Sequence, residues 1–292
     1  MKGPVLLASN HPNSFLDGVI FATLFDQPVY SLARGDVFKK QWIGRLLASM
    51  RLLPVYRTSE GVENLGANYK TFDTCQDIFR KDGIVLIFSE GKCVNEWHLR
   101  PLKKGTARLA NSSWDAGIPL RILPVGINYS SFRTFGKNLF INFGEIIDQS
   151  SVDPTQSDGN RNQLFNTQLK NALKPLVFEI GKTDIPRQKK LLENKPSLVQ
   201  WVLGIIPAFA GWLLHLPIYL PLKKITYSKT NHNDHYDSVF IALLMFTYPL
   251  YLLLLSSLLF YWTGSPYAFF AILLLPFTAW AYIQLKPQLD GQ

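Results

Sequence analysis

Charged residues are scarce in the last third of the chain, and cysteine is scarce throughout. Residues 198–292 contain four Lys or Arg and three Asp or Glu, whereas residues 1–197 contain 26 and 18. This uneven distribution excludes a uniformly soluble globular protein. The two cysteines, Cys75 and Cys93, form no CxxC motif, which argues against a disulfide framework and a structural zinc site. We therefore expect no metal, and a reducing compartment around the charged part of the chain.

The charged part is basic. Its net charge of +8 suits phosphate groups, anionic lipid headgroups or nucleic acid. Aromatic residues concentrate toward the apolar C-terminal segments, where interfacial aromatics are expected, so we predict a membrane partner and no nucleic acid. Only three residues precede the first apolar run, so we expect no signal peptide before the first motif and a native N-terminus that extends further.

Three long apolar segments follow a charged linker. Residues 239–262 and 266–285 carry no charge and are separated by three residues, which predicts a transmembrane hairpin. Residues 198–220 contain two prolines and have lysines at both ends, which favours a re-entrant or in-plane helix over a true span. The predicted organisation is a catalytic domain over 1–181, a basic linker over 182–197 and a membrane region over 198–292.

The first 181 residues alternate short β-type runs with helical stretches, the pattern of an α/β domain. The expected strands are 5–9, 29–32, 52–56, 84–88, 122–128 and 139–143. The expected helices are 15–25, 37–48, 61–81, 105–116 and 163–181.

The first candidate site is the segment Asn-His-Pro-Asn-Ser-Phe-Leu-Asp at residues 10–17, directly after the first strand. With Ser14 as the N-cap of the following helix, Asp17 falls in its first turn, near the loop that contains His11. A carboxylate bound to one ring nitrogen leaves the other nitrogen to accept a proton, which is the arrangement of a general base. The alternative is a capping box from Ser14 to Asp17 with His11 as a loop residue.

The second candidate site follows the strand at 84–88. Ser89, Glu90, Gly91 and Lys92 occupy the carboxyl end of that strand, where α/β folds place ligand sites. Three cations at 100, 103 and 104 precede the helix expected at 105, a combination suited to an anion. The alternative is a solvated basic loop.

Together these segments resemble the phospholipid/glycerol acyltransferase family, which includes the glycerol-3-phosphate and lysophosphatidic acid acyltransferases. The resemblance covers residues 1 to about 145 through four blocks in order: His11 and Asp17 with five residues between them, the strand 52–56 ending in Arg57, Phe-Ser-Glu-Gly at 88–91, and Ile-Leu-Pro-Val-Gly at 122–126. Ser89 replaces the family's Pro in the third block, and Lys92-Cys93 replaces its Thr-Arg.

This resemblance implies a mixed central sheet flanked by helices and transfer of a fatty acyl group from acyl-coenzyme A or acyl carrier protein to a hydroxyl of a glycerol phosphate, in phospholipid biosynthesis. It implies His11 as general base, Asp17 as its orienting partner, and no cofactor besides the acyl thioester co-substrate. It further implies an acceptor site made by Arg57, Ser89, Glu90, Gly91, Lys92, Arg100 and Lys103. The expected location is the inner or cytoplasmic membrane, with the catalytic domain on the cytoplasmic face.

Other interpretations stay open. The acceptor is glycerol-3-phosphate, its 1-acyl form or another lyso-lipid, and the chain could be a catalytically silent, membrane-anchored lipid-binding module. A transporter is disfavoured, because the apolar segments contain no repeat or paired charges. Cys93 is expected to be structural, and a metal pair at His232 and His235 lacks a third ligand.

Overall fold

The computed structural model describes residues 3–56 and 66–289. The chain forms two compact units. The first comprises Met1–Asn128 with Phe140–Lys182, and the second comprises Tyr129–Leu139 with Thr183–Gln292. The loop between the last two strands of the sheet therefore belongs to the same unit as the apolar C-terminal helices.

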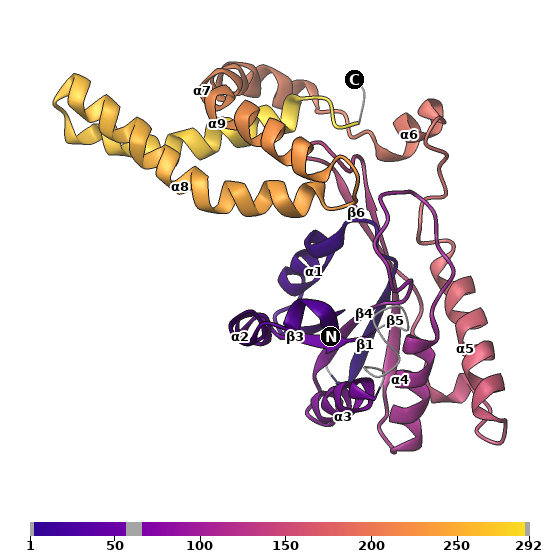
Figure 1. Ribbon diagram of the computed structural model, residues 1–292. Coiled ribbons are helices and arrows are strands. Elements are labelled where there is room, and N and C mark those ends of the chain that lie inside the picture. Colours follow the sequence, from indigo (N-terminus) through magenta and orange to yellow (C-terminus); the bar gives the residue numbers. More distant parts are fainter. Residues whose placement is uncertain (1–2, 57–65, 290–292) are drawn as a thin grey trace. The chain divides into compact units, whose positions relative to one another are not determined.

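A six-stranded sheet lies at the centre of the first unit (Figure 1). The strands are β1 (Val5–Ser9), β2 (Val29–Arg34), β3 (Leu52–Val55), β4 (Ile84–Phe88), β5 (Arg121–Tyr129) and β6 (Leu139–Phe143), in the spatial order β3-β2-β4-β1-β5-β6. The first five are parallel. The last strand, β6, is antiparallel to β5. The backbone N–H of Ser130 donates to the carbonyl oxygen of Asn138, and that of Gly144 donates to that of Pro124, which is an antiparallel pattern. The expected mixed sheet flanked by helices is confirmed.

The helices of the first unit follow the expected order, with shifted boundaries where they are described; residues 61–65 of the helix expected over 61–81 lie outside the described residues. The helices are α1 (Ser14–Thr23), α2 (Gln41–Ser49), α3 (Ala67–Arg80), α4 (Lys104–Asp115) and α5 (Asp158–Leu173), with short 3-10 turns at Gly35–Phe38 and Gln149–Ser151. The helix expected over 37–48 is divided into the first of these turns and α2. The helix expected over 163–181 begins five residues earlier and ends at Leu173, because Pro175 lacks the N–H that another helical turn needs.

The two faces of the sheet are covered by different helices. On one face, Leu6 and Ala8 of β1 and Val85 of β4 belong to a buried cluster that includes residues of α3, α4 and α5. On the other face, Phe21 of α1 is fully buried and contacts Phe88 of β4 edge to face. All five residues of β1 are buried, as expected for a central parallel strand covered on both sides.

The position of the site follows from the pairing of β1 with β4. These strands are parallel neighbours, and Ser9 at the end of β1 is in register with Phe88 at the end of β4. The polar segments that follow both strands therefore leave the sheet at the same edge, although about 80 residues separate them in sequence.

Among the described residues, the second unit contains three helical segments long and apolar enough to cross a membrane. They are α7 (Leu198–Thr230), α8 (Tyr236–Thr263) and the segment Pro266–Leu285, in which a 3-10 turn at Pro266–Phe270 leads into α9 (Ala271–Leu285). A shorter helix, α6 (Ile185–Leu192), precedes them within the segment expected to be a linker. The segment expected over 198–220 continues as one helix to Thr230 despite three internal prolines. The expectation that residues 198–220 form a re-entrant or in-plane helix rather than a true span stays a prediction.

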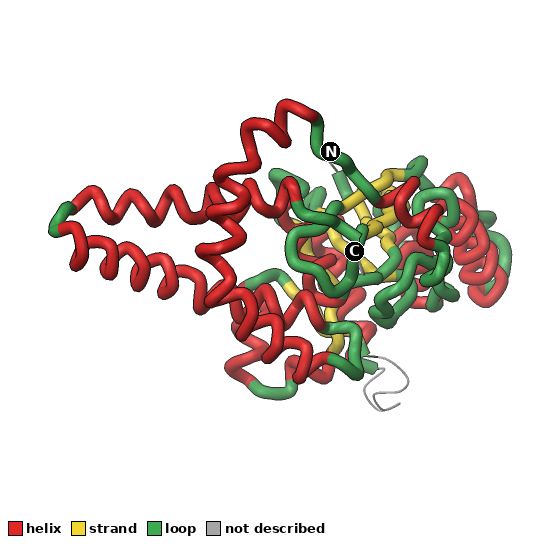
Figure 2. Tube along the Cα trace, turned by 90° about the horizontal axis from the view of Figure 1, so that it is seen from above, coloured by secondary structure: helices red, strands yellow, loops and turns green. Residues whose placement is uncertain are grey.

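Close backbone contacts hold the apolar helices together. A Cβ on Gly211 of α7 would lie 2.0 Å from the carbonyl oxygen of Thr278 in α9, so only glycine permits this approach. Gly264, with a φ of 64°, ends α8 in a left-handed conformation and begins the turn of the helical hairpin. Figure 2 shows the two helices of this hairpin extending to a short loop.

The loop between β5 and β6 packs within the second unit. Lys137 of this loop forms an ion pair with Asp237 in the first turn of α8, and their side chains are only 9% and 4% exposed. Phe135 packs against Phe240 one turn further along α8. Asp237 is thus a partner in a nearly buried ion pair.

Candidate active site

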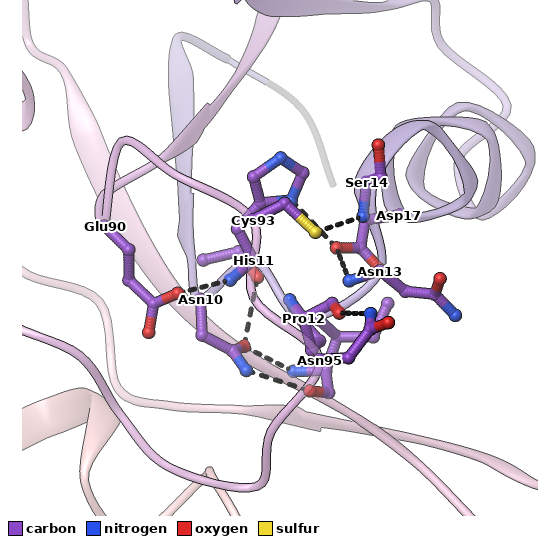
Figure 3. A network of polar contacts seen from close by, with 11 residues as sticks. Asn10, His11, Pro12, Asn13, Ser14, Asp17, Glu90, Cys93 and Asn95 are labelled. Atoms are coloured by element: carbon purple, nitrogen blue, oxygen red, sulfur yellow. Dashed lines mark hydrogen bonds and ion pairs between the residues drawn. The ribbon is translucent and has the colours of Figure 1, made fainter. Parts of the chain in front are cut away.

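The loop between β1 and α1 brings His11 and Asp17 together. Asp17 Oδ2 lies 2.9 Å from His11 Nδ1 and accepts a hydrogen bond from the backbone N–H of Asn13 at 2.8 Å (Figure 3). The Asp17 side chain is fully buried, and that of His11 is 16% exposed. Because a carboxylate only accepts hydrogen bonds, Nδ1 of the neutral ring carries the hydrogen and Nε2 keeps its lone pair.

The start of α1 differs from the interpretation based on sequence. Asn13, rather than Ser14, is the N-cap, and its side chain makes no capping bond. The Asp17 carboxylate binds the Asn13 N–H instead, while it also holds the imidazole. One carboxylate therefore contacts both the N–H of the N-cap residue and the imidazole of His11.

An aromatic ring fixes the plane of the imidazole. Phe88, the last residue of β4, stacks on His11 with ring centroids 3.9 Å apart and an interplanar angle of 11°. Phe21 of α1 packs on Phe88 in turn, with centroids 6.3 Å apart. The ring of His11 is thus held by a carboxylate at one nitrogen and by a supported apolar surface on one face.

Glu90 joins the loop after β1 to the loop after β4 at the edge of the sheet. Its Oε2 accepts the backbone N–H of His11 at 2.9 Å, and its Oε1 accepts the backbone N–H of Arg100 at 2.8 Å. The residue is 3% exposed, and burial raises the pKa of its carboxyl group against the opposing effect of these two hydrogen bonds. Both carboxylate oxygens therefore bind the protein's own backbone.

Two asparagines that sequence reasoning did not select support the same loop. Asn10 exchanges hydrogen bonds with the backbone of Ile127 in β5, donating at 2.9 Å and accepting at 2.8 Å. Asn95 donates to the carbonyl oxygen of Pro12 at 2.7 Å. Its position next to His11 was the only feature of the sequence that could have pointed to Asn10. No sequence feature pointed to Asn95, because its contact with Pro12 depends on the path of the loop after β4.

The comparison with known families agrees with this geometry. The acyltransferase family model matches residues 1–128, which contain the His11–Asp17 pair, the Glu90 loop and the proline-containing strand β5. Residues 1–128 belong to the acyltransferase family. This is the family of glycerol-3-phosphate and lysophosphatidic acid acyltransferases, and the resemblance stated from the four sequence blocks is confirmed. No curated protein matches the chain.

Cys93 of this acyltransferase makes a contact that the sequence did not reveal. Its Sγ accepts the backbone N–H of Ser14 at 2.9 Å, at the first turn of α1. Ser14 has a φ of 51°, a conformation that non-glycine residues rarely adopt. The cysteine therefore helps to hold the strained start of the helix that carries Asp17.

The predicted acceptor residues of the acyltransferase divide into buried and exposed groups. Ser89 is buried, and its Oγ accepts a hydrogen bond from Thr106 Oγ1 at 3.0 Å. Gly91 has a φ of 67°, and a Cβ there would lie 2.9 Å from Lys103 Cγ, so glycine permits the lysine stem to cross the turn. Lys92 and Lys103 are themselves exposed.

Of the two arginines predicted at the acceptor site, the structure describes only Arg100. Arg100 is half-buried, and its Nη1 donates to Glu96 Oε1 at 2.8 Å, so an acidic neighbour already binds its guanidinium group. Arg57 lies outside the described residues. Among the residues that the structure describes, no group of three or more His, Cys, Asp or Glu could hold a metal ion.

Proposed function

We propose that this acyltransferase moves a fatty acyl group from acyl-coenzyme A or acyl carrier protein to a hydroxyl of glycerol-3-phosphate or 1-acylglycerol-3-phosphate. The observation that carries the proposal is the 2.9 Å contact between His11 Nδ1 and Asp17 Oδ2, which leaves Nε2 of a partly exposed imidazole as the proton acceptor. Membership of the acyltransferase family and the apolar helices of the second unit support a lipid product.

In the proposed reaction, His11 Nε2 takes the proton from the acceptor hydroxyl as the hydroxyl oxygen attacks the thioester carbonyl carbon. The tetrahedral adduct then collapses, the carbon–sulfur bond breaks, and the imidazolium returns the proton to the departing thiolate. Asp17 stabilises the imidazolium through Nδ1 and keeps the ring in the required tautomer. This sequence needs no covalent enzyme intermediate.

The acceptor phosphate requires cations beside the base. Lys103 crosses Gly91 next to the carboxylate that binds the His11 N–H, and Lys92 follows Gly91 directly. Both are exposed, which makes them more available to a phosphate than Arg100, whose guanidinium group pairs with Glu96. We assign the acceptor phosphate to Lys92 and Lys103, with Arg57 and Arg100 as further members of the predicted site.

The membrane placement follows from the same chemistry. The acyl chain and the product partition into a bilayer, whereas the thioester carrier is soluble, so the reaction belongs at the interface. The three apolar helices indicate membrane association. The basic composition of residues 1–197 supports a cytoplasmic face for the catalytic unit, in a membrane where phospholipids are made.

The direct test is acyl transfer by membranes that contain the full chain, with labelled acyl-coenzyme A or acyl carrier protein as donor. The acceptors are glycerol-3-phosphate, its 1-acyl form and a panel of other lyso-lipids. We expect transfer to one of the two glycerol phosphates and its loss in His11→Ala. His98→Ala is a matched control, because His98 also pairs with a carboxylate, Glu179, but at an exposed position.

Each outcome has a distinct meaning. Transfer only to another lyso-lipid would replace the proposed acceptor and keep the base. Transfer to a glycerol phosphate that survives in His11→Ala would refute the assignment of the base. Absence of transfer from either donor to any acceptor, with intact binding of lyso-lipid, would support the silent lipid-binding module.

A further inference from the structure

Helix α2 carries an apolar stripe that the protein leaves exposed. Trp42, Leu46 and Met50 are spaced by four residues along α2 and its C-cap, and they are 68%, 53% and 48% exposed. This spacing places them on one side of the helix. None of the nine residues of α2 is buried, although Ile43 and Leu47, on the adjacent side, are half-buried. Packing within the protein therefore covers only part of the apolar surface of α2.

The sequence around this stripe is basic. Residues 37–57 contain five Lys or Arg and no Asp or Glu. Lys39 and Lys40 precede the helix, Arg45 lies on its polar side, and Arg51 follows it. A helix with exposed large apolar side chains, a tryptophan and flanking cations has the composition of a helix that lies in the headgroup region of a membrane.

We propose that α2 lies in the plane of an anionic membrane surface, with Trp42, Leu46 and Met50 inserted between the lipids and Lys39, Lys40 and Arg45 at the phosphates. Two observations favour lipid over a protein partner. The same chain carries three helices apolar enough to cross a bilayer, so a membrane is its expected neighbour. The excess of positive charge along residues 37–57 matches the negative surface of a lipid leaflet.

The proposal is independent of the reaction assigned to His11. It concerns a second attachment of the chain to lipid, through the unit that contains the sheet rather than through the apolar helices. In Figure 1, α1 and α2 lie on the side of the sheet away from α4 and α5. Helix α1 contains Asp17 in its first turn and exposes Phe15 and Val19 four residues apart, so apolar surface also adjoins the candidate active site.

The test measures lipid contact at α2 in the full chain reconstituted into vesicles. The variants Leu46→Cys and Gln41→Cys, in a Cys93→Ser background that removes the half-buried native thiol, are labelled with an environment-sensitive fluorophore. Gln41 is the matched control, because it is exposed on the polar side of the same helix. The vesicles contain phosphatidylcholine alone or with phosphatidylglycerol, and spin-labelled lipids serve as quenchers.

We expect the label at 46 to show blue-shifted emission and quenching by the spin-labelled lipids, and the label at 41 to show neither. Replacing Lys39 or Lys40 by Gln should reduce the ratio of inserted to water-exposed label about fivefold per cation in the anionic vesicles. Equal exposure to water at both positions would overturn the proposal. A shielded label at 46 that lipid quenchers do not reach would also overturn it, and would indicate a protein surface, from this chain or a second copy, as the occupant.

Discussion

The backbone N–H of His11 donates to Oε2 of Glu90 at 2.9 Å, across a sequence separation of 79 residues. The same carboxylate accepts the N–H of Arg100 through its other oxygen. Glu90 therefore fixes the backbone of the candidate base relative to the loop that carries the predicted phosphate ligands. Its effect on acyl transfer would act through position rather than through contact with the acceptor.

Replacement of Glu90 by Gln tests this positioning. The substitution exchanges one carboxylate oxygen for an NH₂ group that cannot accept, so one backbone N–H loses its partner at a cost of about 1–3 kcal/mol. Burial raises the pKa of Glu90 in the folded protein, so the folded state holds its proton more tightly than the unfolded state. Protonation of Glu90 therefore adds to the unfolding free energy of the wild type. This contribution is fully present below the unfolded pKa near 4.5, and it is lost as the pH rises through the higher pKa of the folded state.

The measurement is the unfolding midpoint of wild type and Glu90→Gln in detergent from about pH 4 upward. We expect the advantage of wild type to decrease as the pH rises above 4.5. A wild-type advantage that grows over this range would show that the backbone hydrogen bonds outweigh burial and lower the pKa of Glu90 in the folded protein.

Replacement of Asp17 by Asn should abolish most of the activity and leave the fold intact. The amide oxygen can still accept the Asn13 N–H, but no negative charge remains to hold His11 in the Nδ1–H tautomer or to stabilise the imidazolium. We expect kcat to fall by about 10²- to 10⁴-fold with little change in KM. Asp115→Asn is the control, since Asp115 binds Arg161 through both oxygens in another part of the fold. A comparable loss of kcat in the control would mean that the effect is not specific to the pair.

Cys93 is expected to act through structure and not as a nucleophile. Cys93→Ser keeps an acceptor for the Ser14 N–H, whereas Cys93→Ala removes it. We predict near wild-type transfer for the serine variant, and for the alanine variant lower activity with an unfolding free energy reduced by about 1 kcal/mol. Trapping of a labelled acyl group on Cys93 in wild type would contradict this. Cys75→Ala controls for loss of a thiol, because Cys75 is buried in the core and burial raises its pKa to about 12.

Lys103 should affect the binding of an acceptor that carries a phosphate. Removal of its ammonium group in Lys103→Ala is expected to raise KM for the acceptor by about 10- to 100-fold, the size of a lost charge-assisted hydrogen bond of about 1.5–3 kcal/mol. The KM for the thioester donor should not change. Lys104→Ala is the matched control, because Lys104 is the neighbouring lysine and is also exposed. Equal effects of the two substitutions would indicate general charge attraction and not a phosphate site.

The ion pair between Lys137 and Asp237 predicts a specific pattern of stability. Either Lys137→Met or Asp237→Leu leaves one charge without its nearly buried partner, which costs about 3–5 kcal/mol. The double variant removes both charges and should recover most of that loss. The four unfolding midpoints in detergent form a double-mutant cycle. Additive losses in the double variant would show that the two residues act independently.

The sequence determined the order of the elements and the identity of the candidate base. The runs 5–9 and 84–88 matched their strands at both ends, because buried strands of a parallel sheet are nearly continuous apolar runs bounded by polar residues. The pairing of His11 with Asp17 was also predictable, since both belong to one short loop and the following helical turn.

Tertiary structure alone decided what surrounds that base. The register of β1 with β4 places Phe88 on the imidazole ring and Glu90 on the His11 N–H, and no local pattern encodes a contact across 79 residues. The sulfur of Cys93 meets the Ser14 N–H for the same reason. Local sequence specifies periodicity, capping and turn chemistry, whereas contacts between distant loops depend on the order and register of the strands that carry them.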